Sequence, residues 1–82
     1  MPTISVFYGI IILMHIKDHN PPHIHAIYGE KEATFLIENG KKYTGNLPNR
    51  AIKMVQEFIR INKKELLKMW TNHIYKKLKG IE

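Results

Sequence analysis

The stretch HIHAIYGEKEATFLIENGKKYT, residues 23–44, predicts three antiparallel strands in succession. Apolar and polar residues alternate over His23–Tyr28 and Glu32–Glu38, as in strands that bury one face. Asn39-Gly40 is a dipeptide typical of type I′ hairpin turns. Lys41–Thr44 is therefore expected to return as an edge strand, because its two lysines disfavour pairing with a further strand.

Two apolar segments precede this stretch. Thr3–Phe7 is rich in β-branched and aromatic residues and predicts a short strand. Ile10–Ile16 is a continuous apolar run, the pattern of a strand that is buried on both faces. Gly9 between them predicts a bend or bulge. We expect the strands of residues 3–45 to form one antiparallel sheet of three to four strands.

The remainder of the chain has helical periodicity. Ile52, Val55 and Ile59 form an apolar stripe at helical spacing, and Pro48 suits a first helical turn. These residues predict a helix over residues 48–61.

A second helix is expected over residues 63–78. Asn62-Lys63-Lys64-Glu65 has the spacing of a capping box, which marks a helix start, and Gly80 suits a helix end. The buried face of this helix is expected to consist of Leu66, Leu67, Trp70, Ile74 and Leu78.

Strands followed by helices predict an α+β fold. The chain of 82 residues is short enough to form a single domain, residues 1–82. We expect a small antiparallel sheet of three to four strands, with the two C-terminal helices packed on one face of it.

The composition limits the chemistry and the location. The chain has no cysteine, so it has neither disulfides nor thiolate metal ligands, in keeping with a reducing cytoplasm. The apolar run Ile10–Met14 is too short to span a bilayer, and no signal-peptide pattern is present. We therefore expect a cytoplasmic protein without a membrane anchor.

The net charge of +6 is unevenly distributed. Residues 1–40 carry two lysines against four acidic residues, a net −2, and residues 41–82 carry eleven basic residues against three acidic ones, a net +8. Such a basic half is typical of a protein with a polyanionic or acidic partner, and equally of a lysine-rich solubilising surface.

The block Asp18-His19-Asn20-Pro21-Pro22-His23-Ile24-His25 holds three of the five histidines. His23 and His25 lie on the same face of a strand, roughly 7 Å apart along it. They can converge on one metal ion, with His19 or Asp18 from the preceding loop as a third ligand. Three protein ligands with an open position are typical of catalytic zinc and of non-haem iron, so a divalent transition metal such as zinc is the expected cofactor in this interpretation.

The same block also suits metal-free acid–base chemistry. His23 and His25 would act as general base and general acid in RNA cleavage, in which the 2′-hydroxyl is the nucleophile. Asp18 would orient one of the histidines. The basic residues expected to contact phosphate are Lys41, Lys42 and Arg50.

A third interpretation makes the block structural. His19 would cap the loop, and Asp18 would bind the backbone of the turn. His15, in the apolar run, and His73, in the second predicted helix, are interpreted as packed or surface histidines rather than ligands.

The chain resembles a small bacterial family known as domain of unknown function 4160. The resemblance covers nearly the whole chain. It rests on Met1–Ser5, Phe7–Ile10, the block of residues 18–25, Tyr28-Gly29-Glu30, Gly45–Pro48, Arg50-Ala51, Glu65–Leu67 and Trp70. If the family's site is the histidine block, it corresponds to Asp18, His19, His23 and His25 of this chain.

The resemblance implies a role by analogy, because the family has no settled activity. Its genes often lie beside another small gene, in an arrangement similar to toxin–antitoxin pairs. We therefore expect a toxin-like component of a two-gene module that acts on or binds RNA through the histidine block.

Two alternatives remain open. In one, the chain is a non-catalytic module whose basic helices bind a small acidic protein from the neighbouring gene, with or without a second copy of the chain. In the other, it is a metal-dependent hydrolase.

Overall fold

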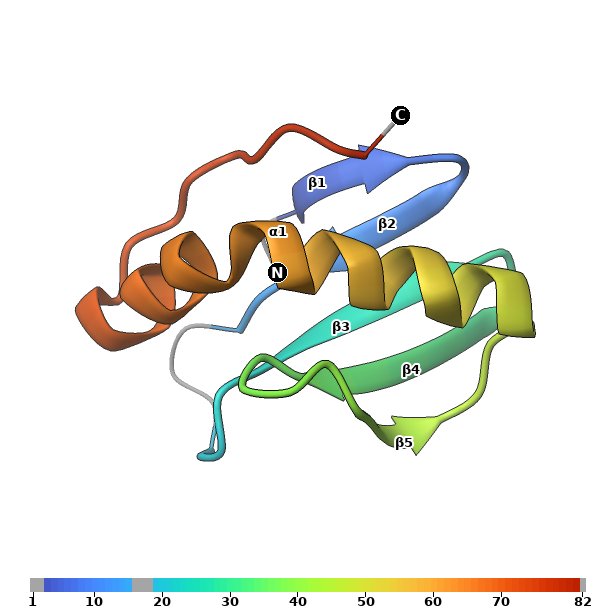
Figure 1. Ribbon diagram of the computed structural model, residues 1–82, viewed down its shortest axis with the longest axis horizontal. Coiled ribbons are helices and arrows are strands. Elements are labelled where there is room, and N and C mark those ends of the chain that lie inside the picture. The colour runs from blue at the N-terminus through green and yellow to red at the C-terminus, as the bar shows by residue number, and fades with distance from the viewer. Residues whose placement is uncertain (1–2, 16–18, 82) are drawn as a thin grey trace.

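The computed structural model describes residues 3–15 and 19–81 and shows a sheet covered on one face by a helix (Figure 1). Every pair of neighbouring strands is antiparallel, and the strands follow one another in chain order across the sheet. The elements are β1 Thr3–Phe7, β2 Ile10–Leu13, β3 His23–Tyr28, β4 Lys31–Leu36, β5 Lys42–Gly45 and α1 Asn49–Asn72. The predicted α+β class is confirmed, but the sheet has five strands rather than three to four.

A two-residue turn joins β1 to β2. Tyr8 and Gly9 both have positive φ, 49° and 77°, which is the geometry that a type I′ turn requires. The prediction of a type I′ turn at Asn39-Gly40 is wrong, because Gly40 alone of those two residues has a positive φ. Asn39 instead accepts a hydrogen bond on its side-chain oxygen from the Lys41 N–H, at 2.9 Å.

Strand β2 is shorter than predicted and is not buried on both faces. It ends at Leu13, and Ile11 is 37% exposed. Ile10 and Ile12 alternate with Ile11 and are fully buried, so β2 presents one face to the core.

The prediction of two helices is also wrong, because α1 is continuous. Asn62 has non-helical angles, φ −106° and ψ 15°, and kinks the helix without ending it. Its side-chain N–H donates to the carbonyl of Phe58 one turn earlier, at 3.0 Å. Asn62 therefore does not cap a second helix as predicted, because its side chain bonds to a carbonyl within the same helix.

The helix ends at His73, which takes the left-handed conformation, and not near Gly80 as predicted. The following segment runs back to β1 (Figure 1). The Leu78 N–H donates to the carbonyl of Ile4 at 2.7 Å, so this segment lies along the edge of β1. Ile74 is consequently 58% exposed and does not belong to a buried helical face.

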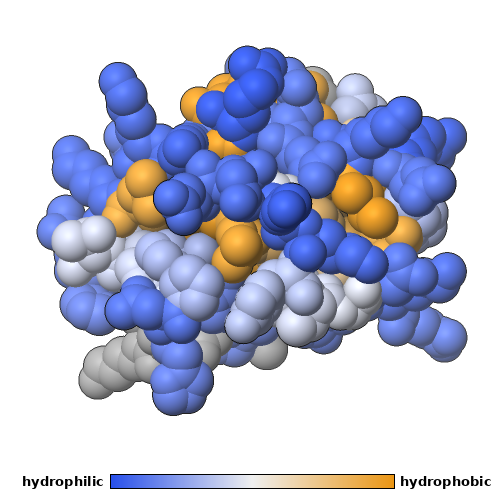
Figure 2. All heavy atoms as spheres, turned by 60° about the horizontal axis from the view of Figure 1, so that its bottom comes forward, coloured by the Kyte–Doolittle hydropathy of each residue, from blue (hydrophilic) through white to orange (hydrophobic). Residues whose placement is uncertain are grey.

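The core lies between the sheet and α1. Ile24, Ala26 and Phe35 project from β3 and β4 and are fully buried, together with Val55 and Phe58 of α1. Hydrophilic residues cover most of the surface in Figure 2, with hydrophobic residues visible only as small islands. No helix in the described part of the chain is long and apolar enough to cross a membrane.

Candidate functional site

His23 and His25 lie on the face of the sheet that points away from α1. Ile24 and Ala26 of β3 enter the core, so the alternating residues His23 and His25 project from the opposite face. His25 pairs across β3 and β4 with Thr34, which pairs in turn with Thr44 of β5. A row of polar side chains therefore crosses three strands of this outer face.

His25 lies at the centre of a cluster of rings. Its ring centroid is 4.4 Å from that of His15 and 5.2 Å from that of His23, both in edge-on arrangements. Its Nδ1 atom lies 3.4 Å from a carboxylate oxygen of Glu32. Both ring nitrogens of His25 are shielded from solvent, so this residue sits beneath the surface of the site.

His23 is held by the backbone of the loop before it. Its Nδ1 atom lies 2.9 Å from the carbonyl oxygen of Pro21. A carbonyl oxygen can only accept a hydrogen bond, so Nδ1 carries the proton of this bond. In the neutral ring, the lone pair is then on Nε2, the nitrogen that can act as a base.

The C-terminal part of α1 also contacts this histidine cluster, through Trp70. The Trp70 ring centroid is 5.2 Å from that of His23, and the Trp70 Nε1–H donates to the side-chain oxygen of Asn20 at 3.2 Å. The histidine loop is thus attached to the last turns of α1.

A depression of about 280 Å³ opens beside His23. Its lining consists of His19, Asn20, Pro21, His23, Thr34, Tyr43 and Thr44. The two threonine hydroxyl oxygens are 2.6 Å apart, and Tyr43 is 60% exposed. Two imidazoles, His19 and His23, therefore line one concavity together with hydroxyl groups and an aromatic ring, while His25 lies behind it.

The structure separates the residues that we expected to contact phosphate. Lys41 and Lys42 are exposed and directly precede Tyr43 of the depression. Arg50 lies in the first turn of α1, 20 residues before Trp70, which corresponds to about 30 Å of helix. Because the molecule is 31 Å long, Arg50 lies at its other end, where it lines a different depression.

The expected orienting residue Asp18 lies outside the described residues. Within them, Glu32 is the carboxylate beside a histidine. The two-residue turn Gly29-Glu30 pairs Ile27 with Glu32, which places Glu32 diagonally across from His25. The predicted strands His23–Tyr28 and Glu32–Glu38 leave three residues between them, so their pairing does not indicate this neighbour, whereas a two-residue turn would have.

His15 and Trp70 were also missed as members of the site. His15 was interpreted as a packed or surface histidine and Trp70 as part of a helical face, and both in fact contact the histidine cluster. Their sequence separation from the block hides this proximity, which depends on how the sheet and the helix pack.

The metal interpretation gains no geometric support from the described residues. Among residues 3–15 and 19–81, no three histidine or acidic side chains are grouped so that they could hold a metal ion. The expected ligand set His19, His23 and His25 stays a prediction, as does zinc.

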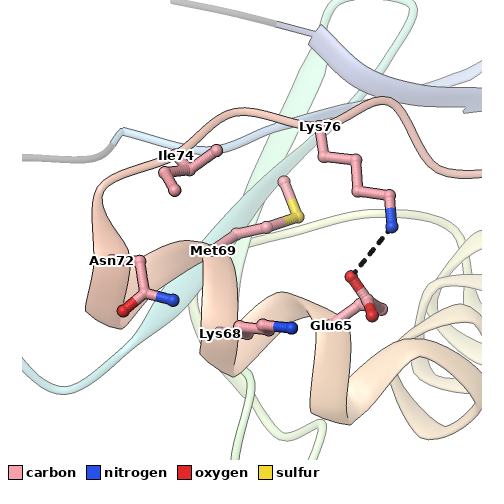
Figure 3. A pocket seen from close by; sticks show the side chains of 6 residues that line it. All are labelled: Glu65, Lys68, Met69, Asn72, Ile74 and Lys76. Carbon is pink, nitrogen blue, oxygen red and sulfur yellow. Dashed lines mark hydrogen bonds and ion pairs between the residues drawn. The ribbon is translucent and has the colours of Figure 1, made fainter.

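A second depression, of about 140 Å³, lies between the end of α1 and the segment that follows it (Figure 3). An ion pair between Lys76 and Glu65, at 3.3 Å, crosses it. Because Glu65 pairs with Lys76 and no histidine lines this depression, we assign it no function.

The comparisons give one family and no individual relative. No curated protein and no solved structure matches the chain. The family model described as "Domain of unknown function (DUF4160)" matches residues 9–71, a stretch that includes β3, β4, β5 and nearly all of α1. A match over more than half of the chain shows that this protein belongs to the DUF4160 family.

Proposed function

We propose that this protein is the toxin-like component of a two-gene module, and that it binds and cleaves single-stranded RNA without a metal. The observation that carries the proposal is the geometry of His23, which lines the depression and whose Nδ1 donates to the carbonyl of Pro21. A backbone bond of this kind fixes the ring and its tautomer, as a general base requires.

The chemistry follows from the two imidazoles in the depression. His23 Nε2 takes the proton of a ribose 2′-hydroxyl, and the 2′-oxygen attacks the adjacent phosphorus. The bond from phosphorus to the 5′-oxygen breaks, and protonated His19 donates a proton to that oxygen. The products are a 2′,3′-cyclic phosphate and a free 5′-hydroxyl, so atoms and protons balance without a co-reactant.

The rest of the depression supports RNA as the substrate. The exposed ring of Tyr43 offers a surface on which a base can stack. Thr34 and Thr44 offer hydroxyl groups to a base or a ribose. Lys41 and Lys42, directly before Tyr43, are exposed, and we expect them to contact the neighbouring phosphates.

The experiment is a cleavage assay with end-labelled single-stranded RNA in the presence and absence of a chelator. We expect cleavage by the wild type in both conditions, with cyclic phosphate ends, and a loss of roughly 100-fold or more for His23→Gln. His73→Asn is the matched control, because His73 is exposed at the end of α1 and asparagine tolerates its left-handed backbone. Cleavage that disappears with chelator would instead favour the metal-dependent alternative.

A second function, binding of a small acidic protein, is favoured by the outer side of α1. Lys53, Arg60, Lys64 and Lys68 recur at intervals of four or seven residues and are exposed, so they form one basic stripe along the helix. The hydrogen bond that Arg60 donates to the Glu57 carboxylate, and the negative charge of that carboxylate, raise the pKa of Arg60 above the usual value. The stripe faces away from the sheet, so an acidic partner could bind it without covering the depression.

This second function predicts salt-dependent binding of the acidic product of the neighbouring gene. We expect the triple variant Lys53→Glu/Lys64→Glu/Lys68→Glu to lose binding while RNA cleavage persists. The control is Lys31→Glu in the β3–β4 hairpin, which reverses one charge away from α1. Equal binding by the triple variant and the wild type would exclude the basic stripe as the contact.

A further inference from the structure

We propose that Trp70 is the positioning residue of the site, and that it fixes the direction in which the His23 ring presents Nε2 to the depression. This inference rests on the proposed function for its kinetic consequence. Its geometric part, the contact between one indole and one imidazole, can be tested without any RNA.

Trp70 joins two parts of the molecule that are far apart in sequence. It lies near the end of α1 and is only 8% exposed, although it does not line the depression. Its Nε1–H donates to Asn20, which is 50 residues earlier in the chain and does line the depression. The indole therefore does not line the depression itself, but it is hydrogen-bonded to a residue that does.

The same indole limits the movement of the catalytic ring. The His23 and Trp70 rings are tilted by 54°, with centroids 5.2 Å apart. On other sides the His23 ring meets the carbonyl of Pro21 and the edge of His25. Because a ring bounded in this way has little room to rotate about χ2, its basic nitrogen stays in one place between turnovers.

Removal of the indole would free both the loop and the ring. Without the bond to Nε1, Asn20 loses the side-chain hydrogen bond that ties its loop to α1. Without the ring face, His23 gains space on the side away from the depression. A displacement of about 1 Å in a catalytic group is enough to slow a reaction by roughly 100-fold.

The first test uses the fact that Trp70 is the only tryptophan of the chain. A protonated imidazole in contact with an indole quenches its fluorescence, so we expect the emission to change from pH 8 to pH 5, the range in which histidines ordinarily become charged. His23→Gln should abolish most of this change, and His73→Asn should retain it. A full change in His23→Gln would overturn the contact on which the proposal rests.

The second test separates positioning from binding and from stability. We expect Trp70→Leu to lower kcat by roughly 10- to 100-fold with KM within about twofold, and Trp70→Phe, which keeps a ring face, to lose less. Asn20→Ala removes the same hydrogen bond from the other side, so its effect should largely disappear in the Trp70→Phe background. The midpoint of thermal unfolding is measured for each variant, and rates are compared below the lowest one.

The outcomes distinguish the two proposals. If the wild type cleaves RNA and folded Trp70→Leu keeps its kcat, Trp70 does not position the site. If the wild type does not cleave RNA but the fluorescence depends on His23, the proposed function fails while the contact is supported. If kcat falls only in proportion to the folded fraction, Trp70 is merely structural and the proposal is overturned.

Discussion

The two faces of β3 use neighbouring residues for different purposes. Ile24 and Ala26 are fully buried against the layer that α1 forms. His23 and His25, one position away in each case, lie on the opposite face among other polar and titratable groups. Because side chains alternate along a strand, six residues can contribute to the core and to a site at the same time. The comparison predicts that stability and activity respond to different substitutions of the same strand.

The largest effect is expected on the core face. Ile24→Ala removes a fully buried side chain from between the sheet and α1. We expect it to lower the free energy of unfolding by about 2–5 kcal/mol, because it removes buried apolar surface and leaves a cavity. Urea denaturation measures this loss, and a change below about 1 kcal/mol would show that the inner face is less tightly packed than described.

The next effect concerns the way that β5 carries Tyr43 and Thr44 to the depression. Gly45 has φ +79°, and a Cβ atom there would lie 2.2 Å from the carbonyl oxygen of Glu32 and 2.8 Å from the Cα of Ala33. Both contacts are with backbone atoms, so Gly45→Ala must displace β5 from β4. We expect a loss of roughly 1–3 kcal/mol from the backbone strain, more if the edge detaches.

The matched control for this substitution is Gly29→Ala in the β3–β4 turn, where φ is also positive but no atom lies within 4 Å of the added Cβ. Thermal unfolding of the two variants should place Gly45→Ala well below Gly29→Ala. Equal midpoints would indicate that β5 contributes little to stability.

A smaller effect is expected from the carboxylate of the outer face. Glu32→Gln keeps the size of the side chain and removes its charge beside His25. Because Glu32 is about half exposed, solvent screens the interaction, and we expect the unfolding free energy to change by less than about 1 kcal/mol. The rate of RNA cleavage should nevertheless fall clearly, because Glu32 contacts His25 and the His25 ring packs against the His23 ring. A rate that equals that of the wild type would remove Glu32 from the site.

The smallest effect is expected at the apolar end of the outer face. Val6 is 55% exposed and pairs with Ile11, which is itself partly exposed. Val6→Thr retains the β-branched shape, so we expect a change within about 0.5 kcal/mol and no change in cleavage. A destabilisation of more than 1 kcal/mol would mean that another surface, such as a second copy of the chain, covers Val6. Unfolding midpoints at several protein concentrations test that possibility.

The strands were predicted better than the helix, for a local reason. Period-two alternation located β3 at its observed bounds, because one buried face forces that pattern. The β-branched and aromatic content of Thr3–Phe7 located β1 at its observed bounds. The helix pattern was misinterpreted at Asn62, since an asparagine that bonds back to the carbonyl of Phe58 has the same sequence signature as one that starts a helix. Ile74 and Leu78 keep helical spacing, but Leu78 bonds to the backbone of Ile4 at the edge of β1. No local pattern reveals such a long-range bond.

The candidate site was predictable as a region but not as an arrangement. The density of histidines between residues 18 and 25 indicated where chemistry could lie. Which imidazoles face the same concavity depends on the loop and on Tyr43 of β5. The structure places His19 and His23 there, whereas His25 does not line the depression. Arg50 shows the limit of arguments from charge. It belongs to the basic half of the sequence, but it lies in the first turn of α1, at the opposite end of the helix from Trp70.

The most direct test of the account measures RNA cleavage and unfolding on the same preparations of His23→Gln and Ile24→Val. The account predicts that His23→Gln loses cleavage by roughly 100-fold or more while its unfolding midpoint stays close to that of the wild type. Ile24→Val should lose about 0.5–1.5 kcal/mol of stability and cleave RNA at the wild-type rate. Cleavage that survives in His23→Gln, or that falls in both variants in step with their stability, would contradict the separation of the two faces.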